Sequence, residues 1–215
     1  MRIIAVNGSP RKGRNTAEML QITLEEARTL GADAELIELS DYQIKSCRGC
    51  NRCLHQTTCS IGDDDNAVLH QKLLQADGVI LGSPVYFGNI TGQMKTFIDR
   101  TRPLHLVEAA LKGKIAGALV HAGLRHGGQE FALQYLERFL IGHGLILASG
   151  FEPFEQGARA LFTLGVTGTL FRASDAELNI SWYRTPREDP LTVEACRLLG
   201  RNMVLMHRRF NHVAN

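Results

Sequence analysis

Residues 2–20 read RIIAVNGSPRKGRNTAEML, and this stretch decides the fold class. A short β-branched run at 2–6 ends in a glycine-containing turn, and apolar residues at helical spacing follow from Thr16 to Leu30. A strand that passes through a tight turn into a helix is typical of α/β proteins with a parallel sheet. The sequence therefore predicts that the first strand lies inside such a sheet.

The same alternation continues along the chain. Apolar runs predict further strands at 34–39, 78–84, 114–122 and 145–150, and periodic segments predict helices at 63–76, 91–101 and 129–144. Five apolar strands alternating with helices indicate α/β architecture: a flavodoxin-like, doubly wound, five-stranded parallel sheet in the order 2-1-3-4-5. We expect a single domain over residues 1–215, because no repeat or linker is visible.

Two charged segments flank predicted helices. Aspartates 63–65 stand where the N-terminus of a helix favours negative charge. Residues 151–188 have no clear period and are predicted to be an extended excursion. After it, Asp189 is expected to cap a last helix over roughly 190–210, with Pro190 at its first position.

Composition narrows the function classes. The chain has 215 residues, is 44% hydrophobic and 21% charged, and carries a net charge of +2, which gives no case for nucleic acid or an anionic membrane as a partner. No run resembles a signal peptide or reaches the roughly 20 apolar residues that a membrane-spanning helix needs. We therefore expect a cytoplasmic protein, in which clustered cysteines indicate metal or redox chemistry more than disulfides.

The turn at 7–16, NGSPRKGRNT, has the chemistry of a phosphate site. Backbone amides at a helix start are unsatisfied, and the helix dipole favours an anion there. Ser9, Asn15 and Thr16 add polar donors, and Arg11 adds charge. The turn matches neither the P-loop nor the dinucleotide motif, which disfavours an NTPase or a dinucleotide-binding protein. A capped turn with exposed basic residues is the alternative interpretation.

Two more loops follow the third and fourth strands. Residues 84–90, PVYFGNI, offer the flat side chains of Tyr86 and Phe87, and residues 121–130, HAGLRHGGQE, are rich in glycine. Because the carboxyl ends of parallel strands meet at one edge, where ligands bind near the reversal of strand order, we expect these loops to face the phosphate turn. Alternatively, Tyr86 and Phe87 are core or interface residues, and His126 is an exposed loop histidine.

Four of the five cysteines stand in SCRGCNRCLHQTTCS, residues 46–60. Their spacing, C-x2-C-x2-C-x5-C within a loop at 45–62, suits a [4Fe-4S] cluster, since short runs of this kind ligate neighbouring irons. Zinc also binds four cysteines, usually as two separated pairs, and unmetallated thiols remain a further alternative. Cys196 lies among apolar residues of the last predicted helix and is expected to be a small core residue.

GSPRKGRNT, SPVYFGNITGQMKTFIDR and HGGQE together resemble the NADPH-dependent FMN reductase superfamily, which has a flavodoxin-like fold. The cysteine motif is similar to that of the iron-sulfur flavoproteins of anaerobic archaea and bacteria. The resemblance covers residues 1–150 well and the rest loosely, through GTLF and the final helix.

The resemblance implies two cofactors, FMN and a [4Fe-4S] cluster ligated by Cys47, Cys50, Cys53 and Cys59. The residues that it assigns to FMN are Ser9, Arg11, Asn15 and Thr16 at the phosphate, Pro84, Val85, Tyr86, Phe87, Gly88, Asn89 and Ile90 along the isoalloxazine ring, and Gly123, Gly127 and Gly128 at its border. Arg14 is included in the cofactor site, although many relatives have a small residue or asparagine-glycine there.

The implied function is that of an FMN-dependent oxidoreductase or electron-transfer protein. Ferredoxin or NAD(P)H would supply electrons, a quinone, an oxygen species or another carrier would accept them, and the chain would form a homodimer or homotetramer. No side chain is assigned as a catalytic acid or base, since the cofactors carry the chemistry. The alternatives are an NAD(P)H-dependent FMN or quinone reductase without a cluster, and a non-enzymatic redox sensor that binds zinc.

Overall fold

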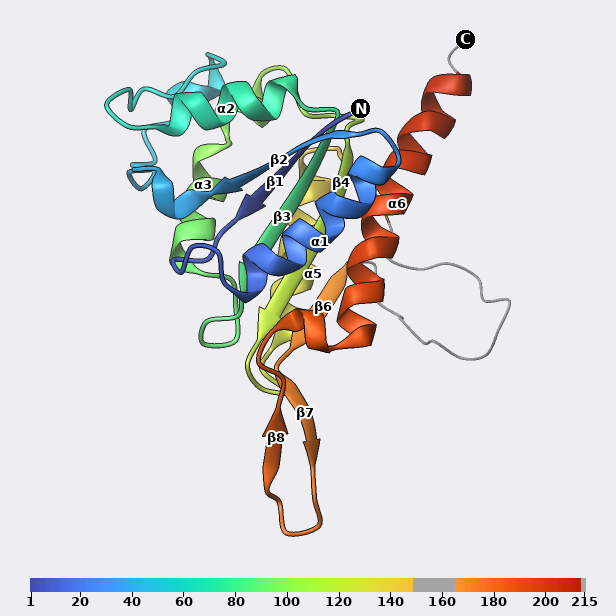
Figure 1. Cartoon of the computed structure of the whole chain (residues 1–215). Coiled ribbons are helices and arrows are strands. Elements are labelled where there is room, and N and C mark those ends of the chain that lie inside the picture. The colour runs from blue at the N-terminus through green and yellow to red at the C-terminus, as the bar shows by residue number, and fades with distance from the viewer. Residues whose placement is uncertain (149–164, 214–215) are drawn as a thin grey trace.

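A computed structural model describes residues 1–148 and 165–213 of the chain. Its centre is a parallel sheet with the strand order β2-β1-β3-β4-β5 (Figure 1). The strands are β1 (Arg2–Asn7), β2 (Asp33–Glu38), β3 (Gly78–Pro84), β4 (Ile115–Ala122) and β5 (Ile146–Leu147). This order confirms the predicted flavodoxin-like fold class.

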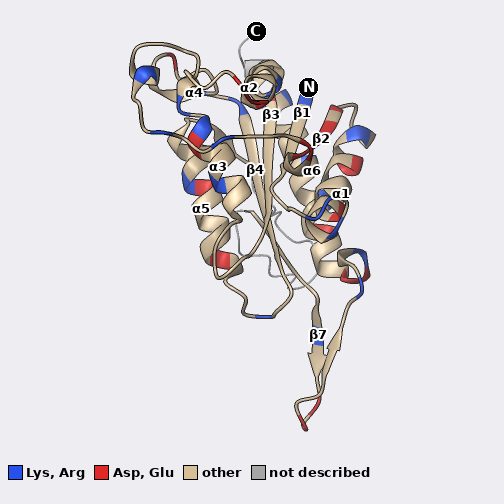
Figure 2. Ribbon diagram, turned by 90° about the vertical axis from the view of Figure 1, so that its left-hand side faces the viewer, with Lys and Arg blue, Asp and Glu red and all other residues tan. Residues whose placement is uncertain are grey.

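Helices cover both faces of the sheet (Figure 2). One face carries α1 (Asn15–Thr29) and α6 (Pro190–Val213), and the other carries α2 (Asn66–Gln75), α3 (Gly92–Arg100) and α5 (Gln129–Gly142). The short helix α4 follows α3, and single 3₁₀ turns complete the described elements: Pro103–Leu106, Leu39–Asp41, Arg52–Leu54 and Pro186–Glu188. The predicted helices are all present, and their ends differ from the prediction by only a few residues.

Two apolar layers stabilise this arrangement, because successive strand residues point to opposite faces of a sheet. Ile4 and Val6 of β1 pack on the side of α2, α3 and α5, while Ile3 packs on the side of α1 and α6. The strands are uniformly apolar because helices exclude water from both faces. At Gly200 the helices α1 and α6 approach so closely that a Cβ atom would lie 2.2 Å from the carbonyl oxygen of Thr23.

Two separate segments, β5 and β6 (Val166–Thr169), pair with β4 along the same edge of the sheet. The sequence analysis predicted a single strand there. β5 pairs with the start of β4, and β6 pairs with its second half. Within the described residues, the strand predicted at 145–150 is therefore short, and part of the excursion predicted at 151–188 returns to the sheet. Gly168 permits this return, since a Cβ atom there would lie 2.8 Å from the sulfur of Met19. The remainder of that prediction, residues 149–164, lies outside the described residues.

β7 (Phe171–Ser174) and β8 (Ile180–Trp182) form an antiparallel hairpin that projects from the carboxyl edge of the sheet (Figure 1). At its base Phe171 and Trp182 pack edge to face, with ring centroids 6.2 Å apart. The predicted excursion thus contains regular structure that carries aromatic side chains to the same edge as the three predicted binding loops.

The last helix, α6, begins as the sequence predicts. Asp189 accepts a hydrogen bond from the backbone N–H of Leu191 at 3.1 Å and another from the hydroxyl of Thr192 at 2.6 Å, and Pro190 is the first helical residue. Neither α6 nor any other helix in the described ranges is both long and apolar enough to cross a bilayer.

Candidate functional site

Three loops meet at the carboxyl edge of the sheet: residues 8–14 after β1, 85–91 after β3 and 123–128 after β4. The hydroxyl of Thr91 donates to the carbonyl oxygen of Gly8 at 2.6 Å, which joins the first loop to the second. A Cβ atom on Gly128 would lie 2.9 Å from the Cα atom of Gly88, so the second and third loops are in contact. The structure therefore brings together the three loops that the sequence assigns to one ligand.

The first loop is organised by its own polar groups. The Ser9 amide donates to the side-chain oxygen of Asn7 at 3.0 Å, and the Arg11 amide donates to the hydroxyl of Ser9 at 3.1 Å. Thr16 is buried in the first turn of α1, Asn15 is half-buried, and the side chains of Arg11 and Arg14 are exposed. No side chain caps the N-terminus of α1, so its first amides are available to an anion.

The second loop contains a tight turn. Tyr86 and Asn89 exchange two backbone hydrogen bonds, and Phe87 and Gly88 between them have φ values of 48° and 80°. The turn leaves the Phe87 side chain fully exposed and Tyr86 exposed, while Ile90 is buried in the core below. Of the predicted ring-binding residues, the two aromatic ones thus face outward and Ile90 supports the loop from beneath; Pro84 is buried, Val85 is half-buried and Asn89 is exposed.

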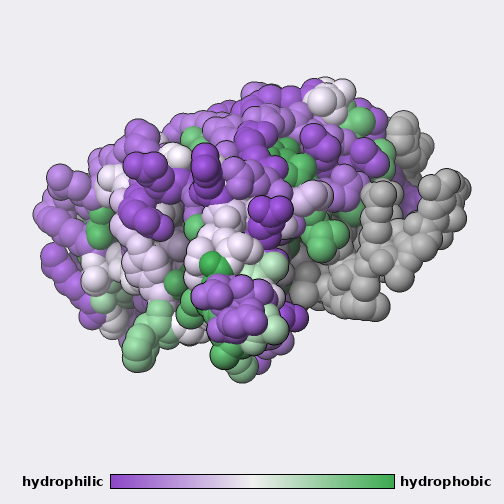
Figure 3. Space-filling model, turned by 60° about the horizontal axis from the view of Figure 1, so that its bottom comes forward, coloured by the Kyte–Doolittle hydropathy of each residue, from purple (hydrophilic) through white to green (hydrophobic). Residues whose placement is uncertain are grey.

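The third loop is held by Gln129, the first residue of α5. Its side chain accepts a hydrogen bond from the Gly127 amide and donates to the carbonyl oxygen of Leu124, both at 2.7 Å. Gly128 has a φ of 92°, Gly123 is exposed, and His126 is exposed, as the sequence analysis expected of a loop histidine. Seen from this edge, hydrophobic side chains surround the hairpin and the loop tips (Figure 3). The large apolar or aromatic side chains that are exposed on the loops after β3 and β4 and on the hairpin are Tyr86, Phe87, Leu124, Leu178, Ile180 and Trp182.

His121 is a residue of this edge that sequence reasoning missed. It is the penultimate residue of β4 and only 4% exposed, and its Nε2 atom has no hydrogen-bond partner within the described residues. Burial, and then the nearby charge of Arg11, lower the pKa of His121 to about 4, so the imidazole is neutral at pH 7. A polar residue inside the apolar run 114–122 was the available signal.

The four clustered cysteines line one small hollow. Arg100 and Arg102 line the same hollow, which lies between the loop at 45–62 and the end of α3. All five cysteines of the chain are free, and Cys196 is fully buried, as expected of a core residue; burial raises the pKa of its thiol to about 12. The structure thus gathers the four predicted metal ligands around one space.

The geometry of this hollow differs from that of a closed single-ion site. In the described part of the chain, no three His, Cys, Asp or Glu side chains converge closely enough to hold one metal ion. A zinc ion needs its four ligands within about 2.3 Å of one point, whereas in a [4Fe-4S] cluster each thiolate binds a different iron. Four separate thiols around one space are the donor set that a cluster needs.

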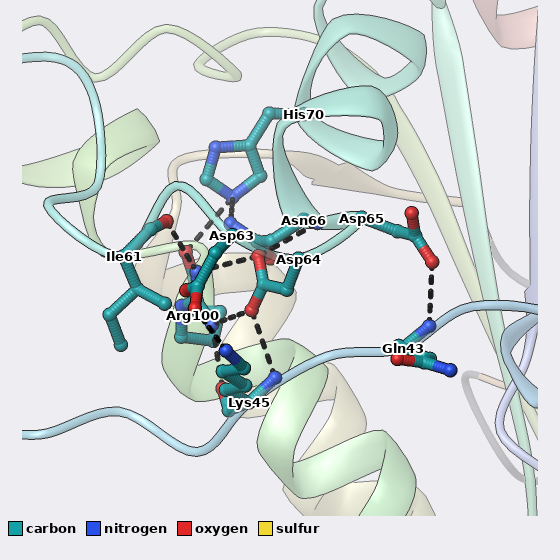
Figure 4. A network of polar contacts seen from close by, with 9 residues as sticks. All are labelled: Gln43, Lys45, Ile61, Asp63, Asp64, Asp65, Asn66, His70 and Arg100. Atoms are coloured by element: carbon teal, nitrogen blue, oxygen red, sulfur yellow. Dashed lines mark hydrogen bonds and ion pairs between the residues drawn. The ribbon is translucent and has the colours of Figure 1, made fainter.

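The ends of the cysteine loop are anchored by Asp63, Asp64 and Asp65 (Figure 4). Asp64 forms an ion pair with Arg100, with a shortest distance of 2.5 Å, and accepts a hydrogen bond from the Lys45 amide at 2.9 Å. Asp65 accepts a hydrogen bond from the backbone amide of Gln43, and Asp63 forms an ion pair with the ammonium group of Lys45. The aspartates stand at the N-terminus of α2, as predicted, and Asp64 accepts a hydrogen bond from the backbone amide of Asn66 at 3.2 Å; in addition, the carboxylates hold the incoming chain.

Burial raises the pKa of Asp64, but hydrogen bonds from Arg100 and from the amides of Lys45 and Asn66 outweigh it and keep that pKa below its ordinary value. Next to this pair, the Nε2 atom of His70 lies 3.0 Å from the side-chain amide nitrogen of Asn66 and 2.9 Å from the carbonyl oxygen of Arg100. Burial lowers the pKa of His70 to about 4. The anchor of the cysteine loop is therefore a charged pair with a neutral imidazole beside it.

Known proteins resemble this chain in sequence over most of its length. A family model described as NADPH-dependent FMN reductase matches residues 1–157. An iron-sulfur flavoprotein of Archaeoglobus fulgidus is 37% identical over 205 residues, which cover 95% of this chain and 94% of that protein.

Two solved structures are similar in fold. A WrbA-like flavodoxin from Agrobacterium tumefaciens has a TM-score of 0.59 at 19% identity and covers 97% of this chain, which spans 98% of that one. RosB, with the bound intermediate 8-demethyl-8-formylriboflavin-5'-phosphate, has a TM-score of 0.75 at 12% identity, covering 99% of this chain and 81% of its own. These similarities establish the flavodoxin-like architecture.

Proposed function

The chain belongs to the NADPH-dependent FMN reductase family and is a flavin-dependent oxidoreductase, and we propose that it pairs FMN with a [4Fe-4S] cluster. In this proposal it passes electrons between a reduced carrier, either ferredoxin or NAD(P)H, and an acceptor. The observation that carries the proposal is the gathering of four free cysteine side chains around one hollow. The iron-sulfur flavoprotein that shares 37% identity with this chain supports it.

We place FMN at the three loops of the sheet edge. The first loop and the uncapped start of α1 would bind the phosphate through backbone amides, with Ser9, Thr16 and the exposed Arg11 around it. Tyr86 and Phe87 would contact the isoalloxazine ring, because both are exposed on a rigid turn that also contacts Gly128. The remaining residues of the proposed site are Arg14, Asn15, Pro84, Val85, Gly88, Asn89, Ile90, Gly123 and Gly127.

The helix α3 connects the two proposed cofactor sites. It begins directly after the second loop, where Thr91 caps it by accepting a hydrogen bond from the Met94 amide at 3.1 Å, and it ends at Arg100 beside the cysteines. Nine helical residues span roughly 14 Å at 1.5 Å per residue. This rigid element fixes the separation of the two sites within one protomer.

When bound, FMN accepts electron pairs and releases electrons singly, and a cubane cluster carries single electrons, so the pair connects two-electron and one-electron partners. The residues of this chain bind and orient these groups: the loops seat the flavin, and the cysteine thiolates would hold the irons. No side chain of the site is needed as an acid or base. A homodimer or homotetramer is part of the proposal, because the aromatic and aliphatic side chains at the sheet edge are exposed in the single chain.

The test is purification without air, followed by assays of FMN, iron and acid-labile sulfide and by a visible spectrum. We expect stoichiometric FMN together with close to four irons and four sulfides per chain, as the [4Fe-4S] formula requires. FMN without iron, with rapid bleaching of the flavin by NADPH, would instead identify an NAD(P)H-dependent FMN or quinone reductase whose thiols are bare. Zinc in place of iron would also refute the cluster.

A further inference from the structure

Arg100 is unusual among the charged residues of this chain. It is the last residue of α3, it is only 1% exposed, and it lines the hollow of the four cysteines. Arginine is rarely buried to this extent unless it is paired or bound. Its surroundings therefore indicate what its charge does in the protein.

Four of the five N–H groups of Arg100 are used within the protein (Figure 4). Nη1 donates to the carbonyl oxygen of Lys45 at 2.6 Å and to Asp64, and Nη2 donates to the carbonyl oxygen of Ile61 at 3.2 Å and to the second oxygen of Asp64. The side chain thereby holds both ends of the cysteine loop on α3. The fifth donor, Nε, is buried and has no partner within the described residues.

Cys59 lines the same hollow as Arg100, and Ile61, two residues after it, accepts a hydrogen bond from Nη2. Burial lowers the pKa of Arg100, but the hydrogen bonds and charge of Asp64 oppose this effect, so the guanidinium stays charged in the folded protein. A buried N–H group such as Nε costs stability unless something accepts its hydrogen bond. A sulfur acceptor at this position would satisfy it.

We propose that Arg100 donates a hydrogen bond from Nε to the sulfur of Cys59, a proposed ligand of the cluster. Through this hydrogen bond and its charge, Arg100 sets the reduction potential of the cluster. This inference rests on the proposed function. Arg100 is a positioning residue, since it acts through the ligand and takes no part in the reaction itself.

The physical reason is electrostatic. A [4Fe-4S] cluster with four thiolates carries a net negative charge, and reduction by one electron makes it more negative. Hydrogen bonds to the sulfurs and nearby positive charge stabilise the reduced form, and so raise the potential. Because Arg100 is buried, its effect is screened much less by salt than that of an exposed cation.

The experiment compares variants that differ in one charge at a time. Asp64→Asn leaves the arginine without its compensating carboxylate, and Asp64→Asn combined with Arg100→Gln removes the arginine charge without leaving a buried carboxylate unpaired. Asp64→Asn combined with Arg100→Lys restores a positive charge. Arg102→Gln is the matched control, because Arg102 lines the same hollow but is half-buried and bonds to Asn51 at 3.2 Å.

Each protein is loaded anaerobically, its iron, sulfide and FMN are measured, and the cluster is titrated with a chemical reductant, such as dithionite, that supplies the single electron. The midpoint potential is read from the electron paramagnetic resonance signal of the reduced cluster. We expect Asp64→Asn to raise the potential. Adding Arg100→Gln should then shift the reduction equilibrium about tenfold toward the oxidised form, which is about 59 mV for one electron.

Lysine at position 100 should recover most of the shift, and Arg102→Gln should change the equilibrium by much less than tenfold. Equal potentials for Asp64→Asn with and without Arg100→Gln, at full iron and sulfide content, would overturn the inference. Loss of the cluster from both the glutamine and the lysine variant would also overturn it, by showing a purely structural anchor. Wild-type protein without iron would refute the proposed function instead.

Discussion

The three loops at the sheet edge and the cysteine loop at 45–62 are held by different means. Hydrogen bonds such as those of Thr91 to Gly8 and of Gln129 to its own loop fix the sheet-edge loops internally. The cysteine loop is fixed mainly at its two ends, by the aspartates and Arg100, and Cys47 and Cys50 between them are exposed. Inside it the contacts are few, among them a 3.1 Å contact between the sulfur of Cys50 and the hydroxyl of Ser60.

This difference predicts how each region responds to its cofactor. Preformed loops bind a ligand with little loss of conformational entropy. A loop with anchored ends and a loose middle gains its order when ligands bind to a metal, so that metal binding and local folding are coupled. We therefore expect flavin affinity to survive the removal of iron, whereas the cysteine loop should become ordered only when the cluster is assembled.

The largest expected effect follows from replacing one clustered cysteine. Cys50→Ser or Cys53→Ser should remove nearly all iron and acid-labile sulfide while the FMN content stays at the wild-type level, because a cluster needs all four thiolates but the flavin loops do not need the cluster. Iron, sulfide and flavin assays on anaerobic protein measure both quantities. Cys196→Ala is the matched control, since that thiol is fully buried in the core away from the hollow, and should keep the cluster. Loss of FMN along with iron would show that the flavin-binding loops depend on the cluster.

The second effect tests whether the ends of the cysteine loop are anchored without metal. In the metal-free protein, Arg100→Met should lower the free energy of unfolding by about 3–5 kcal/mol, because it leaves the buried carboxylate of Asp64 unpaired. Denaturant unfolding measures this change. Adding Asp64→Asn should recover part of the loss, since no buried charge then remains uncompensated.

Glu25→Gln provides the comparison for this ion pair, because it removes an exposed carboxylate that pairs with Arg187 at 2.9 Å. Its cost should be below about 1 kcal/mol. Equal costs for the buried and the exposed pair would show that Arg100 does not anchor the loop.

The sequence predicted the elements that depend on burial, because an apolar strand or an amphipathic helix repeats its signal over many residues. β6 was missed, since four residues that include a glycine give no period, and only pairing with β4 makes them a strand. The cysteine spacing and the loops after β1, β3 and β4 were visible because their residues are adjacent in sequence.

The residues that support the site could not be predicted, because they are far apart in the sequence. Asp64 and Arg100 are 36 positions apart, and nothing local in either segment indicates that they pair. The sequence related aspartates 63–65 only to the helix that follows them, whereas they also have partners at the other end of the loop and on α3. His121 was missed although it interrupts an apolar run, because its burial and its neutral imidazole become apparent only from its neighbours in the fold.

A third effect concerns two buried histidines, His70 beside the cysteine loop and His121 at the sheet edge. Each should contribute about 3 kcal/mol to the pH dependence of the free energy of unfolding. The pKa values of His70 and His121 are lowered to about 4 in the folded protein, against about 6.5 when unfolded, and each pKa unit corresponds to about 1.4 kcal/mol. The unfolded chain therefore binds more protons between these values. The stabilisation from neutral histidine is complete above pH 6.5 and is lost as the pH falls toward 4.

Denaturant unfolding of the metal-free protein at pH 7 and pH 4.5 measures this loss. His70→Gln and His121→Gln should each make stability less dependent on pH over this range, and the two effects should add, since the residues lie on different faces of the sheet. His126→Gln, at an exposed position, is the matched control. An unaltered pH profile in both buried variants would show that these imidazoles are charged or accessible in the folded protein.

The smallest effect concerns the contact between two of the sheet-edge loops. Thr91→Val removes the hydrogen bond to Gly8 and the cap on the Met94 amide, and should cost about 1–2 kcal/mol of stability. Because the phosphate loop is then less well positioned, we expect FMN to dissociate up to about tenfold more readily, which a flavin fluorescence titration measures. Thr29→Val, which removes an exposed hydroxyl bonded to Glu26, should leave affinity unchanged.

The iron content of Thr91→Val decides how independent the two regions are. Thr91 caps the same helix, α3, that carries Arg100 at its other end, so a weakened start of α3 could in principle be transmitted to the cysteine hollow. The buried ion pair with Asp64 should prevent this, because it fixes the end of α3 to both ends of the cysteine loop. We therefore expect weaker FMN binding with wild-type iron and sulfide, and a parallel loss of iron would mean that α3 couples the two sites.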